Sequence, residues 1–77
     1  MLNKFYIISR FYACSETIII VSDKNITLTI KCNKEMIEKV EKYLKRGDLI
    51  SINGTLSNKN TLIASNIMFL SSYERNN

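Results

Sequence analysis

The stretch that most constrains the fold is residues 42–56, where two glycines separate a helix end from a strand. The residues before the first glycine include three basic side chains of the kind that favours a helix C-terminus: Lys42, Lys45 and Arg46. Gly47 suits the left-handed conformation that ends a helix. Apolar and polar residues then alternate over 50–56, and Gly54 falls on the apolar side. An inward glycine allows a kink or a close backbone approach, which a small, curved barrel requires.

Four further segments are typical of strands because they are rich in β-branched and aromatic residues. They are residues 2–12, 17–22, 26–32 and 61–70. Polar turns at 23–25 and 57–60 join two pairs of these strands into hairpins. Apolar residues at helical spacing predict a helix over 34–46, with Asn33 as its N-cap.

Strand periodicity also assigns side chains to faces. On the first strand we expect an inward set of Phe5, Ile7, Ser9 and Phe11, and an outward set of Lys4, Tyr6, Ile8 and Arg10. On the third strand the expected inward set is Ile26, Leu28, Ile30 and Cys32. The polar residues expected to face outward on the strand after Gly47 are Ser51, Asn53 and Thr55. The helix stripe is Met36, Ile37, Val40, Tyr43 and Leu44, and Phe69 is expected in the core.

The order strand, strand, strand, helix, strand, strand predicts an all-β domain with one helix. It matches a five-stranded Greek-key OB-fold barrel with the helix between strands 3 and 4. We expect one such domain over residues 1–70 and a short polar tail over 71–77.

The composition argues against several functional classes. The chain has 77 residues, no histidine and two cysteines, so it offers neither a catalytic base paired with a nucleophile nor a usual metal site. We therefore expect no enzyme activity, no cofactor and no small-molecule substrate. We also expect no membrane segment and no signal peptide, since charged residues interrupt each apolar run. Cys14 and Cys32 are interpreted as small apolar residues in a reducing cytoplasm, with a disulfide as the alternative.

Several segments resemble bacterial single-stranded DNA-binding proteins. The most specific part lies within residues 40–56 and contains Tyr43-Leu44-Lys45-Arg46-Gly47 and Ile52-Asn53-Gly54-Thr55-Leu56. The start, Met1-Leu2-Asn3-Lys4, and residues 62–70 resemble that family's first and last strands. The resemblance covers residues 1–12 and 26–70. It implies sequence-tolerant binding of single-stranded DNA in replication, repair or recombination, in a cytoplasmic, nucleoid-associated protein.

The chain departs from that family in three respects. Both hairpins that are long in the family are reduced here to tight turns, and the chain has no tryptophan on which bases could stack. The end of the chain, residues 73–77, does not resemble the family's acidic C-terminal tail. These differences imply a minimal or divergent member with a smaller DNA site.

Sequence-tolerant binding of single strands needs cations for phosphates and flat rings for bases. The net charge of +4 is compatible with such a polyanionic partner. The candidate nucleic-acid-binding residues away from the helix are Lys4, Tyr6, Arg10, Tyr12, Lys24, Lys31 and Lys59. Tyr6 is the leading candidate for base stacking, and the partner is single-stranded DNA or RNA.

An alternative function is a protein-interaction or oligomerisation module, of a primosomal or mobile-element type, with little DNA affinity. In either case we expect self-association as a dimer or tetramer, since an apolar first strand at a sheet edge invites pairing with its copy.

Overall fold

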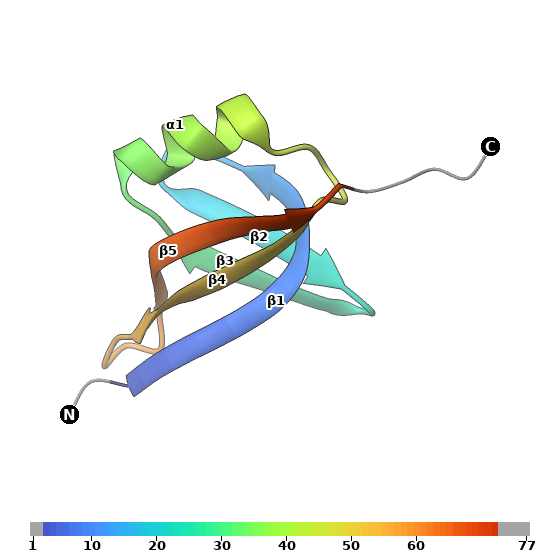
Figure 1. Ribbon diagram of the computed structural model, residues 1–77. Coiled ribbons are helices and arrows are strands. Elements are labelled where there is room, and N and C mark those ends of the chain that lie inside the picture. The colour runs from blue at the N-terminus through green and yellow to red at the C-terminus, as the bar shows by residue number, and fades with distance from the viewer. Residues whose placement is uncertain (1–2, 73–77) are drawn as a thin grey trace.

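The computed structural model describes residues 3–72, which form five strands and one helix. Their order along the chain is β1 (Asn3–Cys14), β2 (Ile18–Asp23), β3 (Ile26–Lys31), α1 (Lys34–Tyr43), β4 (Leu49–Leu56) and β5 (Leu62–Ser71). The strands form a barrel, and α1 lies across one end of it (Figure 1). No helix in this described part of the chain is long and apolar enough to cross a membrane.

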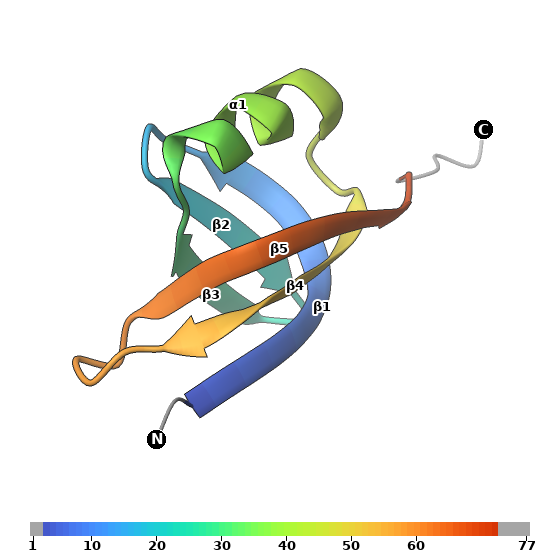
Figure 2. The same cartoon turned by 60° about the vertical axis from the view of Figure 1, so that its left-hand side comes forward.

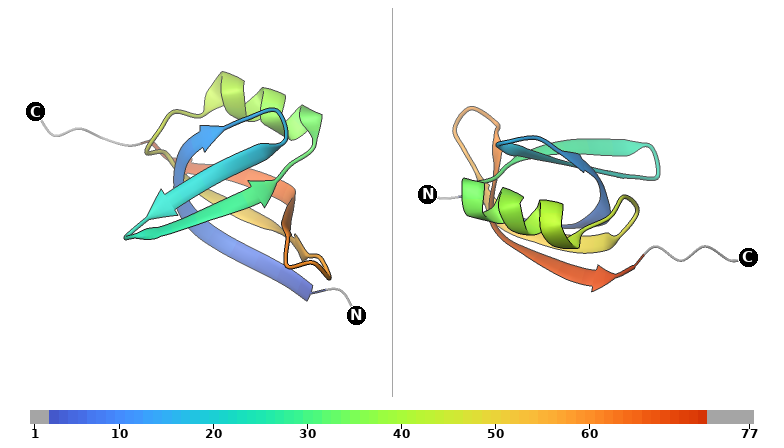
Figure 3. Two further views of the ribbon diagram at one scale, coloured as in Figure 1. Left: turned by 180° about the vertical axis from the view of Figure 1, so that it is seen from behind. Right: turned by 90° about the horizontal axis from the view of Figure 1, so that it is seen from above.

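The barrel closes in the strand order β1-β2-β3-β5-β4. Neighbouring strands are antiparallel except β3 and β5, which run parallel and pair only at Ile30 with Leu62 and Lys31 with Ile63. Seen from above, α1 crosses the mouth of the strand ring (Figure 3). This arrangement confirms the predicted Greek-key OB-fold with its helix between the third and fourth strands.

The long strand β1 is shared between the two halves of the barrel. Its residues 3–10 pair with β4, and its last residues pair with β2. Tyr12 forms a bulge between these parts, because Phe11 lies opposite Val21 whereas Ala13 lies opposite Ile20. The bulge lets β1 bend around the barrel, as the curved ribbon in Figure 2 shows.

The barrel interior is filled mainly by branched aliphatic side chains. Five side chains are almost completely buried: Ile19, Val21, Ile30, Ile50 and Ile52. Ile37 and Val40 of α1 close the core from the end that the helix covers. The predicted inward positions Phe11, Ile30 and Cys32 are buried as expected.

Gly54 marks a close approach between β4 and β5. It lies opposite Ala64, and the pairing shifts by one residue at this point, so that Ser65 is bulged out of β5. A Cβ at Gly54 would overlap the carbonyl group of Ile63 and lie 3.0 Å from the Cα atom of Ala64. The sequence prediction that this glycine permits a close backbone contact is therefore confirmed.

Three apolar side chains that were expected in the core are exposed instead: Ile26, Tyr43 and Phe69, with exposed fractions of 63%, 68% and 52%. Each occupies the end of an element, where the alternation continues but the barrel no longer covers it. Ile26 directly follows the β2–β3 turn, Tyr43 is the last residue of α1, and Phe69 lies beyond the short contact of β5 with β3. Conversely, Ser51, expected to be exposed, is only 5% exposed.

The helix is shorter than predicted. Its N-cap is Asn33 as expected, because the Asn33 side-chain oxygen accepts a hydrogen bond from the Met36 backbone N–H at 2.9 Å. It ends at Tyr43, however, and Leu44 is extended. Gly47 has a positive φ of 98° but serves a separate turn, closed by the Asp48 N–H donating to the Lys45 carbonyl.

At the C-terminal end, β5 runs to Ser71, so it extends one residue into the segment expected to be a tail. Ser72 is exposed and has no regular structure, and residues 73–77 of the predicted tail lie outside the described residues.

The Gly54→Ala variant tests the close approach of β4 and β5. We expect it to lower the free energy of unfolding by about 1–3 kcal/mol, because the added methyl group must push the Ile63 carbonyl aside. Urea unfolding followed by circular dichroism measures this change. Asn53→Ala, an exposed neighbour, is the control, and equal stability of both variants would contradict the close contact.

Candidate nucleic-acid interface

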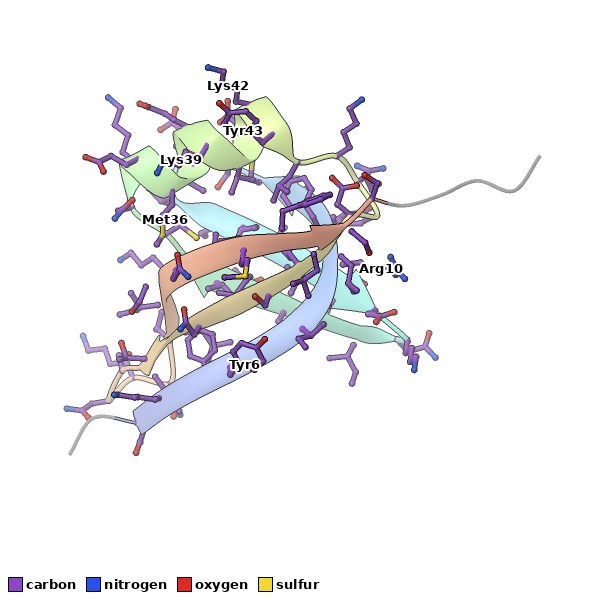
Figure 4. The ribbon with its side chains drawn as sticks, viewed as in Figure 1. Tyr6, Arg10, Met36, Lys39, Lys42 and Tyr43 are labelled. Carbon is purple, nitrogen blue, oxygen red and sulfur yellow. The ribbon has the colours of Figure 1, made fainter. Side chains whose placement is uncertain are left out.

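A surface groove lies at the barrel end opposite α1. Its volume is about 470 Å³, and it is formed by residues 4–6 of β1, residues 53–55 of β4 and Ser65 of β5. Tyr6, labelled in Figure 4, lies over the outer surface of β1 with 65% of its area exposed. Tyr6 and Asn53 are register partners, so a flat ring and an amide lie side by side with Lys4 next to them. The ring could stack a base, while Lys4 could bind a phosphate.

The strand register brings a second predicted cation to the same level of the barrel. Lys31 pairs with Ile63, Ile63 with Thr55, and Thr55 with Lys4, which makes one row across four strands. With strands about 4.8 Å apart, Lys31 and Lys4 are separated by about 14 Å along the barrel wall. Both lysines are exposed. They can therefore contact different phosphates of one nucleic-acid strand.

Lys59 joins this end of the barrel through the β4–β5 turn. The first residue of β1, Asn3, pairs with Leu56 directly before the turn, and the views in Figures 1 and 2 place the two segments together. The turn is ordered by Ser57, whose side-chain oxygen accepts hydrogen bonds from the N–H groups of Lys59 and Thr61. We refer to Lys4, Tyr6, Lys31, Asn53 and Lys59 as the basic end.

The same outer sheet face becomes apolar farther along β1. Ile8 pairs with Ser51 and Ser51 with Met68, and Ile8 and Met68 are 54% and 55% exposed. Ser51 lies in the middle strand of this row, flanked by two large side chains, which accounts for its burial. The outer face of β1, β4 and β5 therefore has a polar, cationic end and an apolar end.

Arg10, another predicted contact, has a partner within the protein. Its Nη1 atom donates a hydrogen bond to the Gly47 carbonyl at 2.9 Å, and the side chain is partly buried. Figure 4 shows Arg10 well separated from Tyr6 along β1. This hydrogen bond ties Arg10 to the turn that follows α1. Although Arg10 lies on the outward side of β1, it is therefore not part of the basic end.

The last two predicted residues lie elsewhere. Tyr12 occupies the bulge of β1, where the Arg46 guanidinium carbon lies 4.4 Å from the centre of its ring. Lys24 lies in the tight β2–β3 turn, in which Lys24 and Asn25 both have positive φ angles of 49° and 71°. The two hairpin turns lie on opposite sides of the barrel (Figures 1 and 3), so Lys24 and Lys59 are far apart.

Sequence reasoning did not select Asn53 or Arg46. Asn53 could have been found from its outward position one residue before the inward Gly54. Arg46 carried no such signal, because its contact with Tyr12 joins residues 34 positions apart. Tyr43 was expected to pack under the helix, but its ring is exposed and lies 5.5 Å from the Lys42 ammonium group.

The cysteines form no reactive centre in the described structure. Both Cys14 and Cys32 are free thiols, so the alternative of a disulfide is not realised. Burial raises the pKa of both thiols, and the nearby Glu41 carboxylate raises the pKa of Cys14 further. A raised pKa disfavours the nucleophilic thiolate. Within residues 3–72, no group of three or more His, Cys, Asp or Glu side chains is placed to hold a metal ion.

No protein-family model matches the chain, and no curated protein sequence matches it significantly. Solved structures do match. A crystal structure of the mitochondrial single-stranded DNA binding protein Rim1 from S. cerevisiae aligns with a TM-score of 0.78 and 15% identity, covering 94% of this chain and 98% of that chain. A second crystal form of Rim1 aligns with a TM-score of 0.78 and 15% identity, covering 97% of this chain and 100% of that chain. A third Rim1 structure aligns with a TM-score of 0.75 and 18% identity, covering 94% of this chain and 98% of that chain.

These similarities show that the chain shares the OB-fold of a single-stranded DNA-binding protein almost from end to end. The sequence resemblance to bacterial single-stranded DNA-binding proteins predicted the same fold. At 15% to 18% identity the likeness concerns the fold, and the binding residues have to be argued from this chain's own surface.

Arg10→Ala tests whether Arg10 is a structural tether. We expect a loss of about 1.5–3 kcal/mol in the free energy of unfolding, because a charge-assisted hydrogen bond to the Gly47 carbonyl is removed. Thermal and urea unfolding measure it. Lys4→Ala, on the same face of β1 but exposed, should change stability by less than about 0.5 kcal/mol. An unchanged Arg10→Ala protein would show that the bond contributes nothing.

Proposed function

We propose that this protein binds single-stranded DNA with little sequence preference and acts in replication, repair or recombination as a binding protein without enzymatic activity. The observation that carries the proposal is the basic end, where a groove is lined by a 65%-exposed tyrosine ring, an amide and Lys4, with Lys31 in the same register row and Lys59 on the adjoining turn. Rings with nearby cations are what sequence-tolerant binding requires. The fold shared with Rim1, described as a single-stranded DNA binding protein, supports the same function.

The alternative is a protein-interaction module with little DNA affinity. The exposed apolar row of Ile8 and Met68 favours it, since such a face can bind another protein chain. The two functions are compatible, because the basic end and the apolar row occupy different parts of the same sheet.

The first experiment is an anisotropy titration of fluorescent oligo-dT. With oligonucleotides of about 15 nucleotides we expect a dissociation constant in the micromolar range or lower. The logarithm of the association constant should fall by about 0.7 for each tenfold rise in salt concentration and each phosphate that the protein neutralises. Duplex DNA of the same length should bind more weakly, because its bases cannot stack on Tyr6. Folded protein that shows no binding at low salt would refute the proposal.

Tyr6→Ala is the specific test of the basic end. We expect its affinity for oligo-dT to fall by about 1–3 kcal/mol, since one base loses its stacking partner. The matched control is Tyr43→Ala, which removes an equally exposed ring (68% against 65%) from α1 at the other end of the barrel. If the two variants lost the same affinity for oligo-dT, Tyr6 would have no specific role in binding.

We further propose that the protein self-associates through β1. Among residues 3–72, β1 pairs with β2 only from Phe11 onward, so the other edge of residues 3–10 has no neighbouring strand. A second copy can pair with that edge around a twofold axis, and the apolar face that carries Ile8 and Met68 can pack against a further pair. The resemblance to bacterial single-stranded DNA-binding proteins supports a dimer or tetramer and a cytoplasmic, nucleoid-associated location.

Met68→Glu tests the association. We expect tetramers to dissociate to dimers, because a carboxylate would be placed on the face by which two pairs pack, while the pairing of the β1 edges is left intact. Sedimentation velocity measures the mass, and Lys39→Glu on the exposed side of α1 is the control. A wild-type protein that sediments as a monomer throughout would contradict self-association.

A further inference from the structure

A stacked pair of side chains lies outside the basic end. The guanidinium carbon of Arg46 lies 4.4 Å from the centre of the Tyr12 ring, and Arg46 Nε donates a hydrogen bond to the Tyr12 carbonyl at 3.1 Å. Both residues are exposed, Tyr12 by 47%. The guanidinium plane is therefore held in one orientation by a ring and a carbonyl, while the pair remains accessible to a ligand.

The backbone beneath the pair is also fixed. Gly47 N–H donates to the Phe11 carbonyl and Phe11 N–H donates to the Asp48 carbonyl, both at 2.8 Å. The Asp48 carboxylate accepts a hydrogen bond from the Lys45 N–H at 2.9 Å, which closes the turn that carries Arg46. The turn and the bulge of β1 thus form one rigid unit.

This rigidity matters for recognition. A free arginine loses much of its side-chain entropy when it binds a ligand, but Arg46 is already ordered by its contacts with Tyr12. Its Nε is used internally, and within residues 3–72 the two terminal nitrogens donate no hydrogen bond. Guanidinium groups bind phosphates through paired N–H donors and offer a flat face on which bases stack.

We propose that Arg46 and Tyr12 form a second nucleotide subsite for single-stranded nucleic acid, an inference that rests on the proposed DNA-binding function. The terminal nitrogens of Arg46 bind a phosphate, and the adjoining base extends the stack of ring and guanidinium. Tyr12 lies six residues from Tyr6 along β1, about 20 Å at strand spacing. Its neighbours on β1 pair with β2, one of the two strands whose face binds oligonucleotides in OB-folds. A strand that contacts both subsites must therefore be several nucleotides long.

The simplest competing role for the pair is a staple that holds the turn to β1. A staple contributes to folding stability, whereas a nucleotide subsite contributes to affinity. The variants Arg46→Ala, Arg46→Lys and Tyr12→Ala separate these roles when melting temperature and oligo-dT affinity are both measured. Tyr12→Phe, which keeps the ring, and Lys45→Ala, which removes a neighbouring exposed charge, are the matched controls.

For oligo-dT of about 15 nucleotides we expect Arg46→Ala and Tyr12→Ala each to weaken binding about tenfold. The double variant should lose no more than either single one, because the two side chains act as one platform. Arg46→Ala should also reduce the slope of log affinity against log salt concentration by about 0.7, because one phosphate contact is lost. Arg46→Lys should keep the charge and this slope but lose most of what Arg46 contributes to the affinity. With oligo-dT of about 3 nucleotides, too short to reach both subsites, the Tyr6→Ala and Arg46→Ala losses should each be smaller. Both controls should stay within about twofold of wild type.

Several outcomes would overturn the inference. If wild type binds oligo-dT but Arg46→Ala and Tyr12→Ala bind equally well and only melt earlier, the pair is a staple, and the proposed function stands without it. If the two losses simply add in the double variant, the residues do not form one subsite. If wild type binds no oligo-dT at all, the proposed function fails together with the subsite. Should Arg46→Ala be unfolded at the assay temperature, the affinity of Arg46→Lys distinguishes the subsite from the staple.

Discussion

The turn from Lys45 to Asp48 connects most parts of this molecule. Its carbonyl and amide groups bond to Phe11 on β1, the Arg10 side chain reaches the Gly47 carbonyl, and the nearly buried Asp48 closes the turn with its carboxylate. These contacts determine where α1 stops, where β4 starts and where β1 leaves β4. They also fix Arg46 against Tyr12. Because the core of a small barrel is limited, the hydrogen bonds of this turn do much to fix the arrangement of the elements around it.

Much of the architecture could be predicted from local sequence. Alternating residues identified the strands, Asn33 marked the helix start, and Gly54 indicated the close approach of β4 and β5. Apart from Ser51, the failures concern residues at the ends of elements. Tyr43 and Phe69 follow the right periodicity, but periodicity describes a face of one element and does not tell where the neighbouring elements end. The predicted helix is too long because Leu44-Lys45-Arg46 suits a helix, whereas tertiary hydrogen bonds place it in a turn.

The candidate site was predictable to a different degree. The alternation of β1 placed Lys4 and Tyr6 on one outer face, which the structure confirms. That Lys31 lies at the same level required the register of four strands, and this register includes a parallel pair that no local pattern reveals. The roles of Arg10 and Arg46 depend on contacts across 37 and 34 residues, so charge and position alone could not separate a tethered cation from an available one.

The bulge at Tyr12 has a consequence for how the chain can change in evolution. Odd-numbered side chains of β1 point inward up to Phe11, whereas beyond the bulge the even-numbered Cys14 lies opposite the fully buried Ile19. Loss or gain of one residue within β1 would therefore reverse the faces of a whole half-strand, exchanging its core side chains for its surface ones. The two hairpin turns carry no such restriction, because insertions there leave the register of both flanking strands intact. Length variation among related barrels should accordingly be found in the hairpins, while the residue count from Asn3 to Cys14 stays constant.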